Sequence, residues 1–321
     1  MNNNYPIGVA LPTRVFNEWD KYGKLVTDNF NSFTCENEMK PEAILVRPTN
    51  GGEPSLRFDA SEKAVSKAVE VGAKMRLHTL VWHSQTPAWF FTEDYTDDGA
   101  LVGRDVMLGR MEWYIKSVLD HFGNNYPDLF YAVDVVNEAY DVGDGDEDGV
   151  RKKNSKWYET IGPDFVYYAF VYARKYAPAG MKLFYNDYSC MYKPDIILRQ
   201  IERSRAEHLI DGIGMQTHLD INTDVDAFIA TAKRFCDAGY EVQLTEIDVG
   251  VKEPTEENFI RQGEFYRRLT DGIKSLRDDG YGITSLTVWG ISDGLSWRWK
   301  EFPLLFDKDL RPKPAYHGFF G

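Results

Sequence analysis

Two glutamates stand where an apolar run of the sequence gives way to polar residues. Glu138 follows Asn137 at the end of the run Tyr131–Val136, and Glu246 comes soon after the run Glu241–Leu244. A carboxylate at the end of an apolar strand is costly unless a site uses it. Glycoside hydrolysis needs two carboxyl groups around one bond, one protonated to release the leaving oxygen and one ionised to attack carbon or activate water. The two glutamates are candidates for this pair.

Most of the other apolar runs also end in side chains that could bind or orient a sugar. These side chains are Glu36, Asn37 and Lys40; His78, Trp82 and His83; Tyr188; Gln216 and His218; Asp248; and Trp289. Tryptophan offers a flat apolar face with a polar edge, which suits a sugar ring. One polar ending would be weak evidence because loops are polar anyway. Seven endings together favour a shared site.

Such a site requires elements that bring the strand ends together. Short apolar runs typical of strands occur at Pro6–Leu11, Ser32–Thr34, Met75–Val81, Tyr131–Val136, Lys182–Tyr185, Gly212–Met215, Glu241–Leu244 and Ser285–Val288. Stretches with helical spacing lie between them at Asp59–Val71, Arg104–Phe122, Pro163–Tyr176, Pro194–Arg205, Val225–Ala238 and Glu256–Arg277. Pro163 and Pro194 fit the first turn of a helix, where a missing N–H costs nothing.

Eight strand–helix alternations without a flexible linker predict an α/β fold, a single (β/α)8 TIM barrel, with residues 1–321 as one catalytic domain. The C-terminal ends of barrel strands meet at one mouth, where Glu138 and Glu246 would face each other from strands three positions apart. A doubly wound open sheet is the alternative. It normally has a glycine-rich turn after its first strand, and the sequence VALPTRVF contains none.

The charge and cysteine content of the chain disfavour several classes of binding partner and cofactor. The chain has 37 Lys and Arg against 50 Asp and Glu, a net charge of −13, which disfavours nucleic acid and anionic membranes. Three cysteines without Cys/His ligand spacing predict neither a disulfide framework nor a metal, and no cofactor is expected. The acidic segment from Asp144 to Gly149 matches half of a calcium loop, but Ser155 stands where a bidentate Glu is required. A solvated loop is the better interpretation.

The chain resembles the family 10 glycoside hydrolases, which are endo-β-1,4-xylanases. The resemblance rests on FTCENEMKPEAI, HTLVWHSQTPAW, DVVNEA, LFYNDYS, GIGMQTHL, VQLTEIDV, VWGISDGLSW and PLLFDKDLRPKPAY. These segments occur in the family's order and cover nearly the whole chain. The resemblance implies endo-acting hydrolysis of xylan with retention of configuration, by double displacement through a covalent glycosyl-enzyme. Its expected binding partners are xylan and xylo-oligosaccharides, and we expect a monomer.

The resemblance also implies roles for individual residues. Glu138 is expected to be the acid/base and Glu246 the nucleophile, with their carboxyl groups about 5–5.5 Å apart, as retaining enzymes require. His218 and Asp248 would hold Glu246 in place and ionised. The implied sugar contacts are Asn137, His78, Trp82, Gln216, Trp289 and Trp297 around the cleaved sugar; Glu36, Asn37, Lys40 and Gln85 on the non-reducing side; Tyr188 on the leaving-group side; and His83 in the wall near His78.

Other functions remain open at this stage. A second retaining β-1,4-glycanase, such as a cellulase or mannanase, would share both glutamates. A metal-dependent barrel hydrolase could use His78, His83, His218 and Asp248, and a carbohydrate-binding protein would need no catalysis. The start MNNNYPIGVAL lacks the layout of a signal peptide. The protein is therefore expected to be cytoplasmic, or secreted if a leader has been removed.

Overall fold

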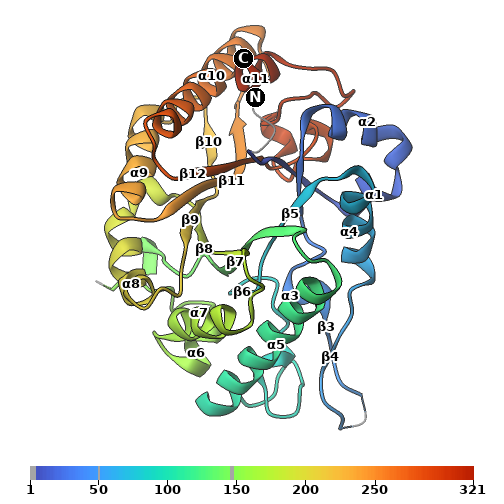
Figure 1. The fold of residues 1–321 in the computed structure, drawn as a ribbon, viewed down its shortest axis with the longest axis vertical. Coiled ribbons are helices and arrows are strands. Elements are labelled where there is room, and N and C mark those ends of the chain that lie inside the picture. Colours follow the sequence, from blue (N-terminus) through green and yellow to red (C-terminus); the bar gives the residue numbers. More distant parts are fainter. Residues whose placement is uncertain (1–4, 50, 145–147) are drawn as a thin grey trace. The chain divides into compact units, whose positions relative to one another are not determined.

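The computed structural model describes residues 5–49, 51–144 and 148–321, which divide into two compact units. The first unit comprises Met1–Thr34, Tyr188–Pro194 and Ile213–Gly321, and the second comprises Cys35–Asp187 and Asp195–Gly212. Each unit alternates parallel strands with helices, as the sequence predicts, and Figure 1 labels most of these elements.

The first unit is built on parallel strands. They are β1 (Ile7–Leu11), β2 (Ser32–Cys35), β9 (Gly212–Met215), β10 (His218–Asp220), β11 (Glu241–Gly250) and β12 (Ile283–Val288), with Cys35 and Gly212 assigned to the second unit. Strand β12 pairs in parallel with β1 and with β11. Strand β10 pairs with β11 and places His218 opposite Asp248. All five residues of β1 are buried, as expected for an apolar strand covered on both faces.

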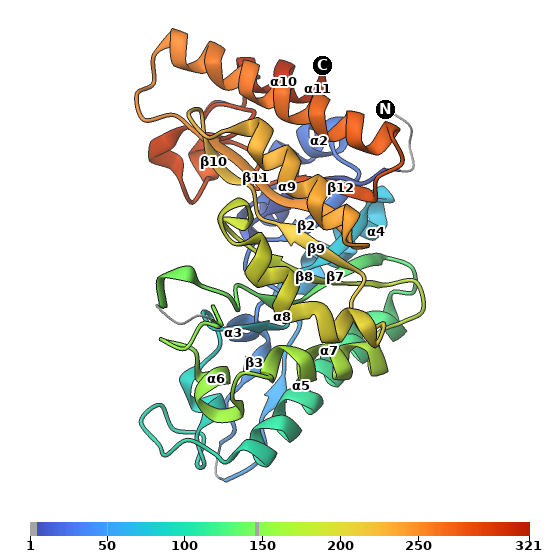
Figure 2. The ribbon, with the colours of Figure 1, turned by 90° about the vertical axis from the view of Figure 1, so that its left-hand side faces the viewer.

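Helices cover these strands in the first unit. They are α1 (Thr13–Asn17), α2 (Trp19–Asn29), α9 (Val225–Asp237), α10 (Glu256–Asp278) and α11 (Pro314–Phe320), with short turns η3 (Cys190–Tyr192), η4 (Asp293–Leu295) and η5 (Trp299–Glu301). The Asp224 side chain caps α9, and the Thr255 side chain caps α10. Helices α10 and α11 lie side by side in Figures 1 and 2. Their close approach depends on glycine, because a Cβ on Gly318 would lie 2.0 Å from the carbonyl oxygen of Gly263.

The second unit carries the remaining strands. They are the antiparallel pair β3 (Leu45–Val46) and β4 (Ser55–Leu56), and the parallel set β5 (Lys74–Leu77), β6 (Val81–Trp82), β7 (Phe130–Asn137) and β8 (Lys182–Asp187). Strand β7 is central, because it pairs with β5, β6 and β8. Its register places Asn137 beside Trp82 on one side and Asn186 on the other.

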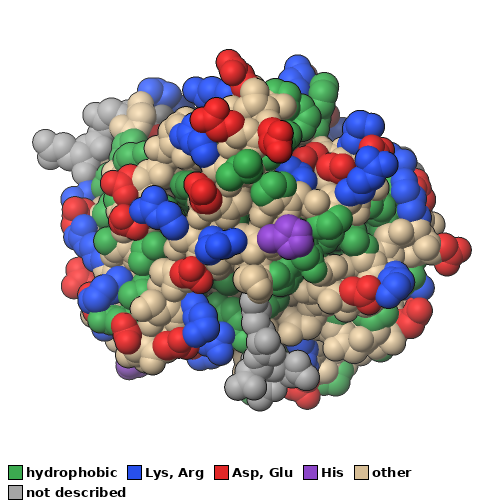
Figure 3. Space-filling view, turned by 90° about the horizontal axis from the view of Figure 1, so that it is seen from above, with side chains coloured by type: hydrophobic (Ala, Val, Ile, Leu, Met, Phe, Trp, Pro, Cys, Tyr) green, Lys and Arg blue, Asp and Glu red, His purple; other side chains and the backbone are tan. Residues whose placement is uncertain are grey.

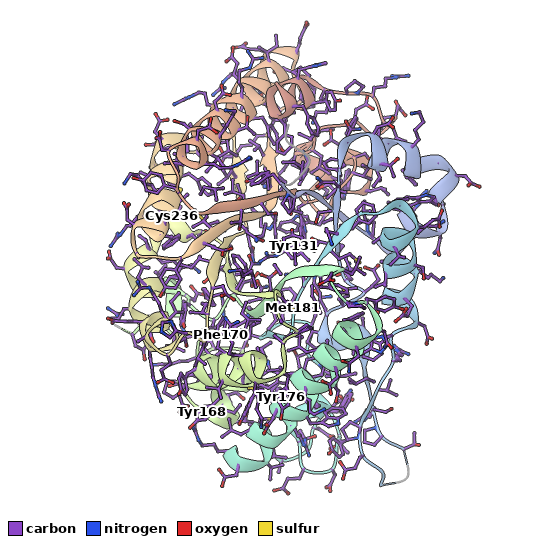
Figure 4. All side chains as sticks on the ribbon, in the orientation of Figure 1. Tyr131, Tyr168, Phe170, Tyr176, Met181 and Cys236 are labelled. Carbon is purple, nitrogen blue, oxygen red and sulfur yellow. The ribbon has the colours of Figure 1, made fainter. Side chains whose placement is uncertain are left out.

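The helices of the second unit are α3 (Pro41–Ile44), α4 (Asp59–Val71), α5 (Arg104–Asn125), α6 (Lys156–Ile161), α7 (Phe165–Tyr176) and α8 (Pro194–Ala206, of which Pro194 belongs to the first unit), with turns η1 (Ala88–Phe91) and η2 (Val142–Asp144). Phe170, labelled in Figure 4, is buried on α7. Tyr176, labelled at the end of the same helix, donates a 2.7 Å hydrogen bond to Glu112 of α5. Apolar packing and the hydrogen bond between Tyr176 and Glu112 together hold α7 to α5.

The predicted elements agree with the structure in type, with three corrections. The strand predicted at Glu241–Leu244 is too short, because β11 continues to Gly250 and contains Glu246 and Asp248. Helix α4 and strand β9 have the predicted bounds. The single strand predicted at Met75–Val81 is wrong, because β5 ends at Leu77 and β6 begins at Val81. The first-turn position predicted for Pro163 is also wrong, because α7 begins at Phe165, whereas Pro194 does begin α8. Strands β3, β4 and β10 and helices α1, α2, α3, α6 and α11 are additional to the predicted set.

Two further observations bear on the partners. None of the helices in the described residues is long and apolar enough to cross a membrane. On the face drawn in Figure 3, basic and acidic side chains are intermingled, so the charge of −13 is not gathered into an acidic patch there. Residues 145–147 of the predicted acidic loop lie outside the described residues, so its solvated conformation stays a prediction.

Candidate active site

Glu138 directly follows β7 and has an unusual backbone conformation. Its φ is 56°, in the left-handed region, and its backbone N–H donates to the carbonyl oxygen of Asn186 at 2.9 Å. A non-glycine residue adopts this conformation uncommonly and at a cost in free energy. The indole N–H of Trp82 donates to the Glu138 carboxylate at 2.9 Å. The Trp82 indole therefore helps to fix the position of the carboxyl group.

The amide of Asn137 is held from the neighbouring strand. The side-chain N–H of Asn186 donates to Asn137 Oδ1 at 2.9 Å, and both residues are buried. This bond fixes the orientation of the Asn137 amide group, with Oδ1 toward β8. Asn186 was noted at the end of a strand in the sequence but was not predicted as a site residue.

A buried lysine organises the polar side chains near Trp82. Lys40 Nζ donates to Gln85 Oε1 at 2.9 Å and to Asn37 Oδ1 at 3.2 Å, and it lies 4.9 Å from the centre of the Trp82 ring. Only 7% of Lys40 is exposed. A buried ammonium group needs such acceptors and the face of an aromatic ring to offset its lost hydration. The predicted residues Asn37, Lys40 and Gln85 thus form one cluster.

His78 belongs to a buried ionic group that the sequence analysis did not identify. Its Nδ1 lies 2.9 Å from Asp134 Oδ2, and the Arg76 guanidinium forms a bidentate contact with the same carboxylate. Burial raises the pKa of Asp134, but Arg76 and His78 outweigh burial and lower it. Asp134 therefore carries its charge and holds His78 in orientation. The available signal was a lone aspartate inside the apolar run Tyr131–Val136.

Glu246 is connected to His218 and Asp248 in the first unit. His218 Nε2 lies 3.1 Å from Glu246 Oε2, and His218 Nδ1 lies 2.9 Å from Asp248 Oδ2. Burial lowers the pKa of His218, but the two carboxylates outweigh burial and raise it to about 10. The ring is therefore an imidazolium at neutral pH and donates to both carboxylates. A charge-assisted hydrogen bond from the imidazolium therefore holds the Glu246 carboxylate in place.

Asp248 in turn is fully buried and accepts from the loop that follows β12. The Trp297 indole N–H donates to Asp248 Oδ2 at 3.0 Å, and the Arg298 guanidinium donates to Asp248 Oδ1. Arg298 also donates to Leu219 O at 3.0 Å and to Glu301 at 2.6 Å. Arg298 is a further residue that the sequence analysis missed, because nothing in SWRWKEF indicates that this arginine reaches back to β10 and β11.

The other predicted residues have these places in the structure. Trp289 is buried, with its ring 6.5 Å from that of His218, while Trp297 is 58% exposed with its ring 5.1 Å from the same imidazole. Gln216 is buried directly after β9, and Tyr188 is half-buried with Lys193 Nζ 4.1 Å from its ring centre. Glu36 is half-buried after β2, and the His83 ring lies 5.9 Å from Trp82.

The predicted residues thus form two groups, one in each unit. Glu138, Trp82, Lys40, Asn37 and Gln85 are linked in the second unit, and Glu246, His218, Asp248, Trp289 and Trp297 are linked in the first. Each group contains one glutamate on a parallel strand or directly after one: Glu138 follows β7, and Glu246 lies within β11. Glu138 accepts from the Trp82 indole, and Glu246 contacts the His218 imidazolium.

Comparison with known proteins identifies the family. The family model described as Glycosyl hydrolase family 10 matches residues 1–320. The chain belongs to glycosyl hydrolase family 10. Family 10 proteins are (β/α)8 barrels, so the fold class predicted from the sequence is confirmed.

Named members of family 10 are similar to this chain along most of its length. Endo-1,4-β-xylanase A of Thermotoga maritima is 38% identical over 330 residues, which cover 98% of this chain and 30% of that protein. An exoglucanase of Acetivibrio thermocellus is 37% identical over 320 residues, which cover 97% of this chain and 28% of that protein. The chain therefore spans less than a third of the length of these two relatives.

A solved family 10 structure of similar length is also available. The intracellular xylanase of Thermoanaerobacterium saccharolyticum has a TM-score of 0.88 at 36% identity, covering 99% of this chain and 96% of that one. A mutant of that enzyme has been solved in complex with xylotriose.

Proposed function

We propose that this chain hydrolyses internal β-1,4-xylosidic bonds of xylan with retention of configuration. The observation that carries the proposal is a pair of glutamates, each held by a donor from a neighbouring strand. Glu246 accepts from His218, whose pKa of about 10 makes it a cation, while Glu138 accepts from the neutral indole N–H of Trp82. Membership in family 10 supports the roles of Glu138 as acid/base and Glu246 as nucleophile.

The proposed reaction has two displacements at the anomeric carbon. In the first, the Glu246 carboxylate attacks that carbon while Glu138 donates its proton to the departing glycosidic oxygen, which leaves a glycosyl ester on Glu246. In the second, Glu138 takes a proton from a water molecule, the water oxygen attacks the same carbon, and Glu246 is released as a carboxylate. Two inversions give retention. The separation of about 5–5.5 Å between the two carboxyls stays a prediction of this mechanism.

His218, Asp248 and Asn137 have supporting roles in this proposal. His218 holds Glu246 in place and ionised, and Asp248 fixes the orientation of the His218 ring. Asn137 donates to the 2-hydroxyl of the sugar being cleaved, which is consistent with its Oδ1 being occupied by Asn186. A hydrogen bond to that hydroxyl strengthens as positive charge develops on the ring in the transition state.

The remaining predicted residues are proposed to bind sugar. Lys40, Asn37 and Gln85, already linked to one another, would bind the adjacent xylose on the non-reducing side together with Glu36. The sugar being cleaved would contact His78, Trp82, Gln216, Trp289 and Trp297, with His83 in the wall near His78 and Tyr188 on the leaving-group side. Most of these groups are held by protein contacts before substrate arrives, which reduces the ordering cost of binding.

The substrate class is tested by comparing products from several polysaccharides. We expect release of short xylo-oligosaccharides from xylan and from xylohexaose, with far lower rates on cellulose and mannan. The early products should be oligosaccharides of mixed length, because an endo-acting enzyme cuts internal bonds. Release of xylose alone from one chain end would contradict endo action. A higher rate on cellulose or mannan would contradict the substrate assignment.

A second retaining glycanase function is favoured by one observation. The relative from Acetivibrio thermocellus is named an exoglucanase. Glucose differs from xylose by a hydroxymethyl group, which would have to fit beside Trp289 or Trp297. Rates measured side by side on aryl cellobioside and aryl xylobioside distinguish the two functions, because the two substrates have the same leaving group and undergo the same reaction.

We also propose that residues 1–321 act as one catalytic domain and as a monomer that binds xylan and xylo-oligosaccharides. Size-exclusion chromatography with light scattering tests the monomer. The two predicted locations, cytoplasmic and secreted, stay predictions, and fractionation of the source cells distinguishes them.

A further inference from the structure

The second unit has a surface pocket of about 550 Å³ outside the groups described above. Its walls come from three segments: Glu53 and Pro54 beside β4, Glu93 and Tyr95 after η1, and residues 106–113 of α5. On α5 the lining residues are Val106, Gly109, Arg110 and Trp113. This volume is within the range of small-molecule sites.

An aromatic layer separates this pocket from Trp82 and Glu138. The Phe90 ring lies 6.4 Å from that of Trp113 on one side and 6.2 Å from that of Trp157 on the other. Trp157 then donates from its indole N–H to the carbonyl oxygen of Trp82 at 3.1 Å. Phe90 and Trp157 are both buried. The pocket is therefore a separate feature of the second unit, and Phe90 supports one side of the Trp113 ring.

The polar groups of the pocket are only partly used by the protein. The Tyr95 hydroxyl donates to one Glu53 oxygen at 3.0 Å, and the Arg110 guanidinium stacks 4.1 Å from the Tyr95 ring centre. Arg110 Nη1 donates to the carbonyl oxygens of Phe90 and Thr92. Within the described part of the chain, neither the Glu93 carboxylate nor the Trp113 indole N–H makes a hydrogen bond to the protein. Both remain available to a ligand.

These groups suit a neutral ligand with many hydroxyls. A hydroxyl both donates and accepts, so it can pair with the Glu53 and Glu93 carboxylates as well as with the Trp113 and Arg110 N–H groups. The Trp113 ring adds an apolar face for the C–H groups of a sugar. Two carboxylates against one guanidinium disfavour a phosphate or other anion. A metal ion is also disfavoured, because the described residues contain no cluster of three or more His, Cys, Asp or Glu side chains that could hold one.

We propose that this pocket is an accessory binding site for the xylan chain, distinct from the catalytic groups; the choice of xylan rests on the proposed function. A polymer held at two places dissociates more slowly than one held at a single place, because the second contact forms at high effective concentration. The accessory site therefore keeps long chains on the enzyme and has little effect on a substrate of two sugars.

The first experiment fills the pocket from Gly109. A Cβ at this position would meet no atom within 4 Å, so a side chain there enters the pocket without disturbing the core. Gly109→Trp is the blocking variant, and Gly109→Ala is the matched control. In a Glu246→Ala background that leaves the polymer intact, we expect Gly109→Trp to adsorb to insoluble xylan about three- to tenfold more weakly, the loss of one or two hydrogen bonds, and Gly109→Ala to adsorb normally. With Glu246 present, both variants should cleave aryl xylobioside at the unchanged rate.

The second experiment observes the pocket directly. In the Glu246→Ala background, xylohexaose should shift the indole N–H signal that is absent from the spectrum of Trp113→Phe. Glu93→Gln should lower the affinity for xylohexaose that this signal reports by about threefold. The response of the other tryptophan signals to xylohexaose should stay unchanged.

The outcomes separate the accessory site from the proposed function. Equal adsorption of all Gly109 variants, or a Trp113 signal that ignores xylohexaose, overturns the accessory site while leaving the catalytic assignment intact. A Trp113 signal that responds to cello-oligosaccharides and not to xylohexaose overturns the choice of ligand. Absence of xylan hydrolysis by the unaltered enzyme instead overturns the proposed function, whatever the pocket variants do.

Discussion

Glu246 tests the proposed mechanism at the scale of a single residue. Replacing it with alanine removes the proposed nucleophile and no core side chain, so Glu246→Ala should abolish xylan hydrolysis while the protein stays folded. Initial rates on xylan and a thermal unfolding curve measure the two properties. Retention of more than a few per cent of the activity, with contaminating enzyme excluded, would show that another group is the nucleophile.

Glu138→Ala should behave differently, because the first displacement needs little acid when the leaving group is good. With an aryl xylobioside that carries such a group, the glycosyl-enzyme should accumulate and be visible by mass spectrometry. Added azide should then restore turnover, because it attacks the intermediate without a general base. Glu246→Ala is the control and should show neither effect. A Glu138→Ala variant that lacks both accumulation and rescue would remove the acid/base assignment.

His218 links the charge of this site to stability. Its pKa is raised from 6.5 to about 10 by Asp248 and Glu246, so the folded protein holds this proton more tightly than the unfolded chain does. The resulting stability is fully present below pH 6.5 and is lost as the pH rises through about 10. We expect the difference in Tm between the wild type and His218→Gln to shrink over this window. A difference that is constant from pH 6 to about 10.5 would mean that the ring is neutral throughout.

At the scale of elements, the contact between α10 and α11 is the most sensitive to added volume. Gly318→Ala would bring a Cβ to 2.0 Å from the Gly263 carbonyl oxygen, and the helices must move apart. We expect a loss of about 1–3 kcal/mol in the free energy of unfolding, measured with denaturant. Gly109→Ala on the open face of α5 is the matched control and should be neutral or stabilising by up to about 1 kcal/mol. Equal effects of the two substitutions would contradict the packing argument.

The elements also show which features the sequence could predict. The 13-residue helix α4 has its predicted bounds because its apolar residues recur with helical spacing, and the four-residue strand β9 has its predicted bounds because its run is apolar throughout. Strand β10 is only three residues long and is defined by its pairing with β11, so no local sequence pattern predicts it. The same holds for side chains. Glu138 follows a strand end that the sequence predicts, and Glu246 follows the predicted run Glu241–Leu244 although it lies within β11. Arg298, in contrast, contacts Asp248 from a loop whose path depends on the folded structure.

At the scale of the whole molecule, the configuration of the first product tests the mechanism. Two displacements should release β-configured xylo-oligosaccharides before mutarotation, and proton NMR within the first minutes distinguishes them from the α form. A chelator should leave the rate unchanged, because the proposed chemistry uses two carboxyls and no metal. An α product would indicate a single displacement by water and would remove the role of Glu246 as nucleophile.

The contacts of Arg298 have a consequence for anyone who redesigns this enzyme by exchanging loops. The segment after β12 looks like an interchangeable rim, because Trp297 and Trp299 are more than half exposed. It nevertheless carries two of the donors that satisfy the buried Asp248, the Trp297 indole and the Arg298 guanidinium. A loop grafted from another protein would therefore change the substrate specificity and, at the same time, the hydrogen bonds to Asp248, which supports His218. A grafted loop should retain Trp297, Arg298 and Glu301 together and vary only the residues around them.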